Sequence, residues 1–285
     1  MSPEEMLARV LYRDGLMLVI DKPAGQVVHP GPKGGPSLLD YFDALRFGLP
    51  RSPGLAHRLD RDTSGCLVLG RHRKALAHLG ALFRHGRVRK VYWAVVEGGP
   101  EEDEGRIDLP LGRLDVTRGW WMKPDPNGQP AVTTWRVMGR HPSPAGGGSP
   151  RSGGVGGTES NEAAPPPVAA LTRGATLPLR GRDSHSWLLL EPLTGRTHQL
   201  RVHCAAMGWP VVGDAVYGTA PRTGGPPLHL HAREVMVPLY PKREPVRVVA
   251  PLPAHMREAL TACGWHGEEA TAANEAAPIL STAAP

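Results

Sequence analysis

The segment from His57 to Leu69 constrains the fold more than any other part of the sequence. It starts with a dense run of ionisable side chains and passes through the turn-forming string Thr63-Ser64-Gly65 into the apolar run Cys66-Leu67-Val68-Leu69. A glycine turn followed by a short apolar run is typical of a loop that leads into a buried strand. The sequence therefore places a group of charges at the edge of a hydrophobic core.

Asp60 stands out within this segment because basic residues flank it on both sides. The positive charges of Arg58 and Arg61, and of His57 when it is protonated, favour the ionised form of a nearby carboxylate. An ionised carboxylate can act as a nucleophile or as a base at neutral pH. The same string also fits a surface ion-pair cluster without a chemical role, and the charge pattern alone leaves both interpretations open.

The size and charge of the chain limit the class of protein to which it can belong. The chain has 285 residues, of which 35 are glycine and 31 are proline. This length suits one main domain with a sizeable core and much irregular structure around it. The formal net charge of +6 at pH 7 favours a polyanionic partner such as nucleic acid.

The cysteine pattern and the amino terminus bear on location. Cys66, Cys204 and Cys263 lack the paired spacing of zinc or redox motifs, which predicts reduced thiols and a cytoplasmic protein. The acidic amino-terminal residues are not followed by the apolar stretch of a secretory signal or a membrane span. We therefore expect no association with a membrane.

Other catalytic patterns are missing from the sequence. The histidine pairs His198/His203 and His229/His231 lack a further Cys or Glu at ligand spacing, which predicts that there is no metal site. The sequence has no Walker string and no Gly-x-Ser-x-Gly elbow, and the His-Arg-Leu-Asp string lacks the glycine-rich loop that precedes a kinase catalytic loop. Without these patterns, P-loop nucleotide hydrolysis, serine-hydrolase chemistry and kinase activity have no support in the sequence.

Hydrophobic periodicity predicts the main elements around Asp60. Apolar runs predict strands over residues 16–20, 88–96 and 187–190. Apolar residues three and four positions apart predict an amphipathic helix over residues 73–85, and a shorter helix that starts after Ser37.

Two further expectations concern single side chains. Because side chains alternate along a strand, Tyr92 should point to the face opposite Val91 and Trp93. Thr197 is a candidate N-cap for a helix in which Leu200 and later apolar residues share one face.

Composition divides the chain into one domain and two irregular segments. From residue 142 to about residue 183 the sequence is rich in Gly, Pro, Ala and Ser and has no aromatic residue, which predicts a flexible insertion. The Ala-rich residues 266–285 predict a disordered tail. We therefore expect a catalytic domain over residues 1–265 that is interrupted by the insertion.

Three strings follow one another along the chain in a fixed order. They are His57-Arg58-Leu59-Asp60 with Thr63-Ser64-Gly65, then Lys90-Val91-Tyr92-x-Ala94, then Thr194-Gly195-Arg196-Thr197-His198-Gln199-Leu200-Arg201. Together they resemble the motifs of the RluA-type pseudouridine synthases, and the resemblance covers residues 10–141 and 186–260. It begins so near residue 1 that no S4-type RNA-binding domain is expected upstream. The fold that it implies is α+β, a mixed, largely antiparallel sheet with flanking helices and a central basic cleft.

The resemblance also implies roles for single residues. Asp60 matches the catalytic aspartate, Arg201 its ion-pair partner, and Tyr92 the tyrosine that stacks on the target base and can help to remove the C5 proton. No cofactor and no metal are implied. The residues expected to bind substrate are Arg58, His57, Arg196 and Leu230.

The implied function is isomerisation of uridine to pseudouridine in structured RNA, such as a stem-loop of ribosomal RNA or tRNA, by a monomer. One alternative is a noncatalytic RNA-binding or assembly factor on the same scaffold. A second alternative is hydrolysis of an N-glycosidic bond, which needs another carboxylate to activate water. Asp62 and Asp214 are the candidates for that carboxylate.

Overall fold

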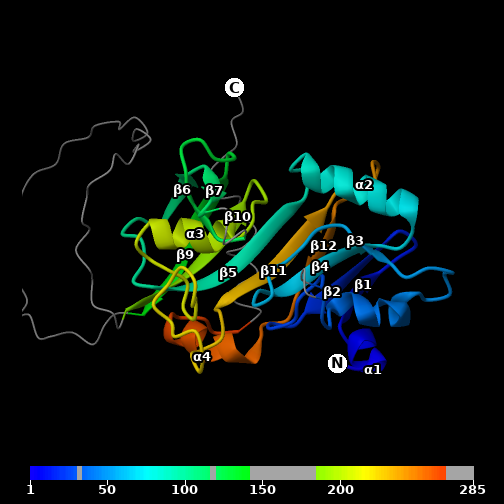
Figure 1. Ribbon diagram of the computed structural model, residues 1–285, viewed down its shortest axis with the longest axis horizontal. Coiled ribbons are helices and arrows are strands. Elements are labelled where there is room, and N and C mark those ends of the chain that lie inside the picture. The colour runs from blue at the N-terminus through cyan, green and yellow to red at the C-terminus, as the bar shows by residue number, and fades with distance from the viewer. Residues whose placement is uncertain (31–33, 116–119, 142–183, 268–285) are drawn as a thin grey trace, which may run out of the picture.

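The computed structural model describes residues 1–30, 34–115, 120–141 and 184–267 (Figure 1). The insertion predicted at 142–183 lies outside these residues, as does the predicted tail apart from its first two residues. The predicted domain limits therefore stay predictions.

One sheet dominates the described part of the chain. Its order is β1-β2-β4-β11-β5-β10-β9-β6, with β3 paired to β4 and β12 paired to β11. Among the described strands of this sheet, β4 and β11 run parallel and the other pairs are antiparallel. With its flanking helices this is the α+β fold that the resemblance implied. The strands are β1 (Val10–Arg13), β2 (Met17–Lys22), β3 (Gly54–Leu55), β4 (Ser64–Gly70), β5 (Arg89–Glu97), β6 (Glu104–Asp108), β9 (Val132–His141), β10 (His185–Pro192), β11 (Leu230–Val237) and β12 (Val246–Val249).

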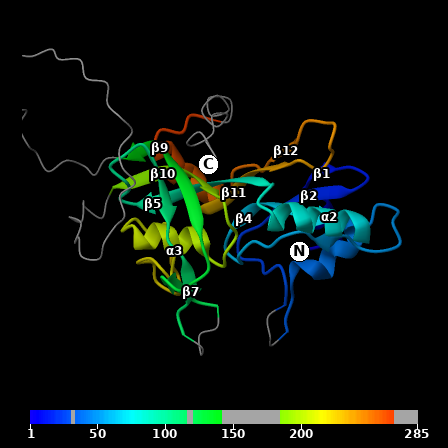
Figure 2. The same cartoon turned by 90° about the horizontal axis from the view of Figure 1, so that it is seen from above.

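Helices cover both faces of this sheet, and Figure 2 shows α2 and α3 over different halves of it. Leu200 of α3 belongs to the same core cluster as Leu190 of β10. Met256 of α4 belongs to the cluster of Trp187, which lies on the other face of β10. The remaining elements are α1 (Pro3–Leu7), the 3-10 helix η1 (Leu38–Leu45), α2 (Arg73–Arg84), α3 (Gln199–Ala206), α4 (Ala254–Ala262) and a two-stranded sheet of β7 (Leu111–Arg113) and β8 (Met122–Pro124).

Most of the elements predicted from periodicity are confirmed. The strands predicted at 16–20, 88–96 and 187–190 are β2, β5 and β10, and the helix predicted at 73–85 is α2. The prediction for Tyr92 is also confirmed. Its side chain packs against the core cluster that contains Leu200, whereas Trp93 belongs to the cluster that contains Met256.

Two local predictions differ from the structure. The segment after Ser37 forms a 3-10 helix, although its apolar side chains are buried as expected. The prediction of Thr197 as an N-cap is wrong, because α3 begins at Gln199 and its N-cap is His198. His198 has a φ of 53°, a left-handed conformation that sequence spacing does not reveal.

The parallel pair β4 and β11 forms a seam between the two halves of the sheet. Gly65 of β4 has a φ of 105°, and a Cβ there would lie 2.2 Å from the carbonyl oxygen of Ala232. A side chain at this position would force the two strands apart. The hydroxyl of Ser64 lies 2.9 Å from Nδ1 of His231 and ties the strands together. The glycine turn found in the sequence thus lets the loop that carries Asp60 enter the sheet at its centre.

Candidate active site

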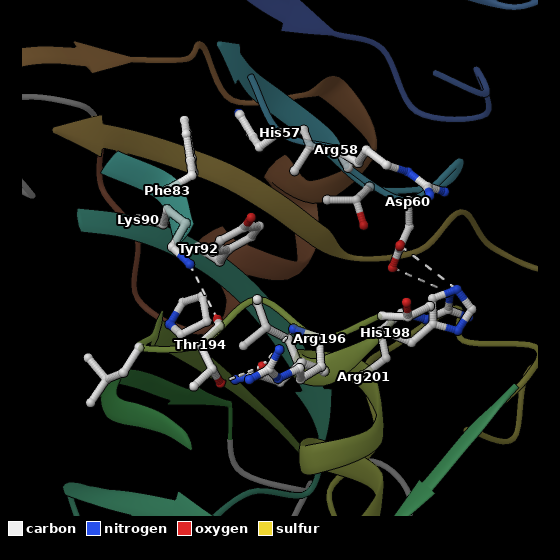
Figure 3. Close-up of a pocket in the computed structure, with 18 of the residues that line it drawn as sticks. His57, Arg58, Asp60, Phe83, Lys90, Tyr92, Thr194, Arg196, His198 and Arg201 are labelled. Carbon is white, nitrogen blue, oxygen red and sulfur yellow. Dashed lines mark hydrogen bonds and ion pairs between the residues drawn. The ribbon is translucent and has the colours of Figure 1, made fainter. Parts of the chain in front are cut away.

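A cavity of about 620 Å³ lies between the loop before β4, strand β5 and the segment that joins β10 to α3 (Figure 3). This volume falls within the range of small-molecule sites in proteins. The structure brings together in its lining the side chains that the sequence selected, which are His57, Arg58, Asp60, Tyr92, Arg196, Arg201 and Leu230.

The loop that carries Asp60 is held by a buried lysine. The ammonium group of Lys22 donates hydrogen bonds to the backbone carbonyl oxygens of Pro23, Arg61 and Thr63, at 2.9, 2.8 and 2.8 Å. These bonds use the three donors of the ammonium group. Burial lowers the pKa of Lys22 to about 8 even though nearby carboxylates oppose the shift. Lys22 therefore fixes the backbone next to Asp60, a role that the turn string around it did not suggest.

The immediate neighbours of Asp60 differ from those predicted. Arg61 forms its ion pair with Asp62, at 3.0 Å. The imidazole of His57 accepts the backbone N–H of Val68 at 3.0 Å, and burial lowers the pKa of His57 to about 3. Arg61 therefore makes its closest contact with another carboxylate, and His57, which is neutral at pH 7, adds no positive charge beside Asp60.

Arg201 approaches Asp60 but makes its shortest contacts with Asp214. Its Nη1 atom lies 4.0 Å from Oδ2 of Asp60, whereas Nε and Nη2 each donate to a carboxylate oxygen of Asp214 at 2.7 Å. Burial opposes ionisation of both side chains, but their mutual hydrogen bonds prevail, so the pKa of Asp214 is lowered and that of Arg201 is raised. Arg201 is thus a fixed cation in a bidentate pair that also faces Asp60, and its pairing with Asp60 is looser than predicted.

His198 is a second neighbour of Asp60, which the sequence analysis considered only as a metal ligand. Its Nε2 atom lies 3.8 Å from Oδ1 of Asp60, and its Nδ1 atom lies 2.8 Å from the hydroxyl of Tyr217. That hydroxyl accepts the N–H of Met122 and has one proton to donate; when it donates to Nδ1, the imidazole proton lies on Nε2. Burial lowers the pKa of His198, so the ring that faces Asp60 is neutral.

Tyr92 and Leu230 supply apolar surface to the cavity. Tyr92 packs against two core clusters. One contains Leu200, and the other contains Leu59 and Ala232. Burial raises the pKa of Tyr92, which keeps its hydroxyl protonated at neutral pH. Leu230 begins β11 and is buried. A flat apolar group that entered the cavity would contact these side chains.

Two arginines of the cavity lining and one aromatic side chain beside His198 complete this region. Arg58 is exposed, and Arg196 donates from Nε to the carbonyl oxygen of Pro130 at 3.0 Å. Trp120, which is 55% exposed, lies edge-on to the ring of His198 with 5.4 Å between the ring centroids. The predicted basic cleft around this region stays a prediction.

The end of the cavity beyond Tyr92 contains a group to which the sequence gave no role. Lys90 precedes Tyr92 by two residues on β5, and its Nζ atom donates to the carbonyl oxygen of Thr194 at 3.3 Å. His57 lies nearby and stacks on Phe83, with 4.4 Å between the ring centroids. Figure 3 shows Lys90 on the far side of Tyr92 from Asp60.

The described residues also bear on metal binding and membrane crossing. Within these residues, no group of three or more His, Cys, Asp or Glu side chains is arranged to hold a metal ion. None of the described helices combines the length and the apolar character that a membrane crossing requires.

Comparison with known proteins agrees with this geometry. A family model described as RNA pseudouridylate synthase matches residues 16–206. An uncharacterized RNA pseudouridine synthase of Zymomonas mobilis is 37% identical over 86% of this chain and 94% of its own length. The ribosomal large subunit pseudouridine synthase C of Vibrio cholerae is 31% identical over 88% of this chain and 68% of its own length.

A solved structure is similar over nearly the whole chain. The human protein RNA pseudouridylate synthase domain containing 1 superposes with a TM-score of 0.66 and 26% identity, and the match covers 99% of both chains. The family match spans more than half of this sequence and includes all three of its motif strings. The chain therefore belongs to the family of RNA pseudouridylate synthases, isomerases that convert uridine to pseudouridine in RNA.

Proposed function

We propose that this enzyme isomerises specific uridines in structured ribosomal RNA or tRNA, and that the carboxylate of Asp60 is its reactive group. The observation that carries the proposal is the position of Asp60 in the cavity. Its side chain is 28% exposed, on a loop fixed by Lys22, between the guanidinium of Arg201 and the imidazole of His198. A carboxylate that is both reachable and held in one position suits attack on a bound substrate.

The reaction requires cleavage of the N1–C1′ bond, rotation of the uracil, and formation of a C5–C1′ bond. Asp60 can begin it by attack on C1′ or by removal of the 2′ proton, and both routes remain open. In either route Asp60 gives up negative charge when it bonds to carbon or accepts a proton. Arg201 and His198 then orient the carboxylate and stabilise it when it is released again.

The cavity also offers a place for the base. We assign to Tyr92 a stacking contact with the flipped uracil, which contributes about 1–3 kcal/mol in comparable sites. Leu230 would pack on the other side of the ring. Because burial raises the pKa of Tyr92, its neutral phenol suits stacking better than removal of the C5 proton.

The remaining predicted residues belong to the approach of the RNA. Arg58 is exposed and can fill the space left by an extruded nucleotide or contact its phosphate. Arg196 and His57 line the cavity on either side of the base position. We assign to Arg196 a contact with an RNA phosphate, and to His57 an uncharged contact with the base.

Hydrolysis of the glycosidic bond is less well supported. It requires a second carboxylate that activates water. The carboxylate of Asp214 is fully buried in its pair with Arg201, and Asp62 is paired with Arg61. Neither is free to hold a water molecule against C1′, so the geometry favours return of the same base to the sugar.

The names of two relatives support the proposed substrate class. The Vibrio cholerae relative is named for the large ribosomal subunit, and a further relative, of Yersinia pestis, is named ribosomal large subunit pseudouridine synthase D. We therefore propose large-subunit ribosomal RNA first and tRNA second, with the target uridine extruded from a loop. Such a substrate, and the three free cysteines, agree with a cytoplasmic enzyme.

The experiment is to map pseudouridine in total RNA from cells with and without the gene. We expect one or a few positions in ribosomal RNA or tRNA to lose pseudouridine when the gene is deleted and to regain it when the gene is restored. Identical maps from the two strains, together with no product from the purified protein on RNA of the deletion strain, would contradict the proposal.

A further inference from the structure

Lys90 places an ammonium group inside the cavity. Lys90 and Tyr92 are two residues apart on β5, so their side chains share one face of the strand, and both line the cavity (Figure 3). The Nζ atom donates to one acceptor, the carbonyl oxygen of Thr194. Among the described residues, no carboxylate lies within ion-pair distance of Nζ. Two of its three N–H groups are therefore available to a ligand.

A cation in this position is costly to the folded protein. Withdrawal of an ammonium group from water is unfavourable unless an anion or several hydrogen bonds replace the water. Burial is the cause that lowers the pKa of Lys90 to about 8, so the group is still mostly protonated at pH 7. Lys22 shows the contrast, because its three hydrogen bonds to carbonyl oxygens use all of its donors. Lys90 lacks such a set within the described residues, and its two remaining N–H groups can bond a molecule that enters the cavity.

The surroundings of Lys90 suit the edge of a base better than a phosphate. Its neighbours in the cavity are the rings of Tyr92, His57 and Phe83, and His57 is neutral at pH 7. Phosphate oxygens carry a full charge and stay partly hydrated, and the exposed Arg58 and Arg84 at the cavity can serve them. A base that stacked on Tyr92 with its sugar at Asp60 would extend its far edge toward Lys90.

We propose that Lys90 is a catalytic residue whose ammonium group donates a hydrogen bond to a carbonyl oxygen of the flipped uracil and stabilises the negative charge on the base after its bond to the sugar breaks. This assignment rests on the proposed function. It extends that function by naming the group that stabilises the departing base.

The charge balance of the reaction explains why such a donor is needed. When the N1–C1′ bond breaks, its electron pair leaves with N1 and is shared with O2 and O4. C1′ then bonds to the Asp60 carboxylate, or the 2′ proton passes to it. When C5 bonds to C1′, the bond between Asp60 and C1′ breaks, or the 2′ proton returns from Asp60 to C2′, and the base becomes neutral again. The C5 proton then leaves to solvent, and N1 takes up a proton from solvent. Lys90 transfers no proton, and its hydrogen bond is strongest while the base is anionic.

The test uses purified protein and total RNA from cells that lack the gene, with enzyme in excess. The rate of pseudouridine formation is measured at the positions that the wild type modifies. We expect Lys90→Met to slow this rate about 100-fold, as loss of a charge-stabilising donor does elsewhere, with RNA affinity within a few-fold of wild type. The matched control Lys74→Met removes an exposed lysine from α2 and should change neither quantity.

Two further readouts separate this role from a structural one. Because Lys90→Met removes a poorly compensated cation, its melting temperature should equal or exceed that of the wild type. The wild-type rate should fall above about pH 8 as Lys90 loses its proton, and Lys90→Arg should shift that fall to higher pH. Arg84 and Arg196 line the same cavity, and burial keeps His57 and Tyr92 neutral in this pH range. Lys22 at the Asp60 loop also has a pKa of about 8, so the part of the fall that Lys90→Arg shifts is the part that belongs to Lys90.

Each alternative result has a distinct meaning. A weaker RNA affinity with a shallower salt dependence, at an unchanged rate, would make Lys90 a phosphate contact and overturn the assignment. A lower melting temperature with a rate loss that disappears on cooling would make it a structural residue and also overturn it. If the wild type itself formed no pseudouridine in any RNA, the proposed function would fail, and this inference with it.

Discussion

Arg201 is tied to Asp214 by two short hydrogen bonds and faces Asp60 at one end of the cavity, whereas Lys90 at the other end faces neutral rings and a single carbonyl oxygen. At the first end the protein supplies the partners for its own charges. Such pairing fixes positions before any substrate arrives. At the second end the ammonium group of Lys90 keeps N–H groups that a ligand can use. The contrast separates the part of the site that positions the sugar chemistry from the part that receives the base.

The largest expected effect is at the Asp60 end. Asp60→Asn keeps the shape of the side chain but removes its charge, so we expect the rate of pseudouridine formation to fall by roughly 10³-fold or more. RNA affinity should stay within a few-fold, because most binding contacts lie outside this group. Asp62→Asn, which removes the neighbouring exposed carboxylate, is the matched control and should retain activity. Substantial isomerisation by the Asp60 variant would remove Asp60 from the mechanism.

The next effect concerns the pairing of charges at the same end. Asp214→Ala leaves Arg201 buried without its bidentate partner, and we expect a loss of about 3–5 kcal/mol in the free energy of unfolding. Asp108→Ala breaks an exposed pair with Arg106 and should cost less than about 1 kcal/mol. Urea unfolding of both variants measures the difference. Equal losses would mean that the Asp60 end is not held by its buried pair.

A smaller effect is expected from the support of the Asp60 loop. Lys22→Met removes three hydrogen bonds to the backbone, which should loosen the loop and slow the reaction by about 10- to 100-fold. RNA affinity should change little. The exposed Lys242→Met is the control. A wild-type rate in the Lys22 variant, measured on protein that remains folded, would show that the loop keeps its position without the lysine.

The smallest effect concerns His57, the neutral side chain at the Lys90 end of the cavity. Burial lowers the pKa of His57 to about 3 in the folded protein, from about 6.5 in the unfolded chain. Between these values the unfolded chain binds more protons, so the free energy of unfolding must fall as the pH is lowered from 6.5 toward 3. His57→Gln should make this fall shallower, and the exposed His78→Gln should not. Unfolding curves at pH 7, 5 and 4 give the slopes, and identical slopes for wild type and His57→Gln would mean that His57 is protonated in the fold.

The sequence predicted the parts of the site that depend on local patterns. The loop that carries Asp60, the strand that follows it and the alternation that turns Tyr92 away from Trp93 all follow from residue order over a few positions. The resemblance to the family then selected Arg201 and Leu230 as site residues, and both line the same cavity.

The remaining parts depend on contacts that residue order does not encode. Lys22 acts on carbonyl oxygens about 40 positions further along the chain. His198, which faces Asp60, has a left-handed backbone conformation. It takes the N-cap position that was expected for Thr197. The role of Lys90 becomes visible only when the missing counter-charge around it is known, and a missing partner cannot be read from a string of residues.

The most direct test of the central claim is a structure of the Asp60→Asn variant bound to its RNA substrate. The account predicts a uridine flipped out of the RNA, with its C1′ atom next to the side chain of residue 60. Its base should lie between Tyr92 and Leu230, and one carbonyl oxygen should lie within hydrogen-bond distance of Nζ of Lys90. A target uridine that stays stacked in the RNA, or a base that turns its carbonyl edge away from Lys90, would contradict it.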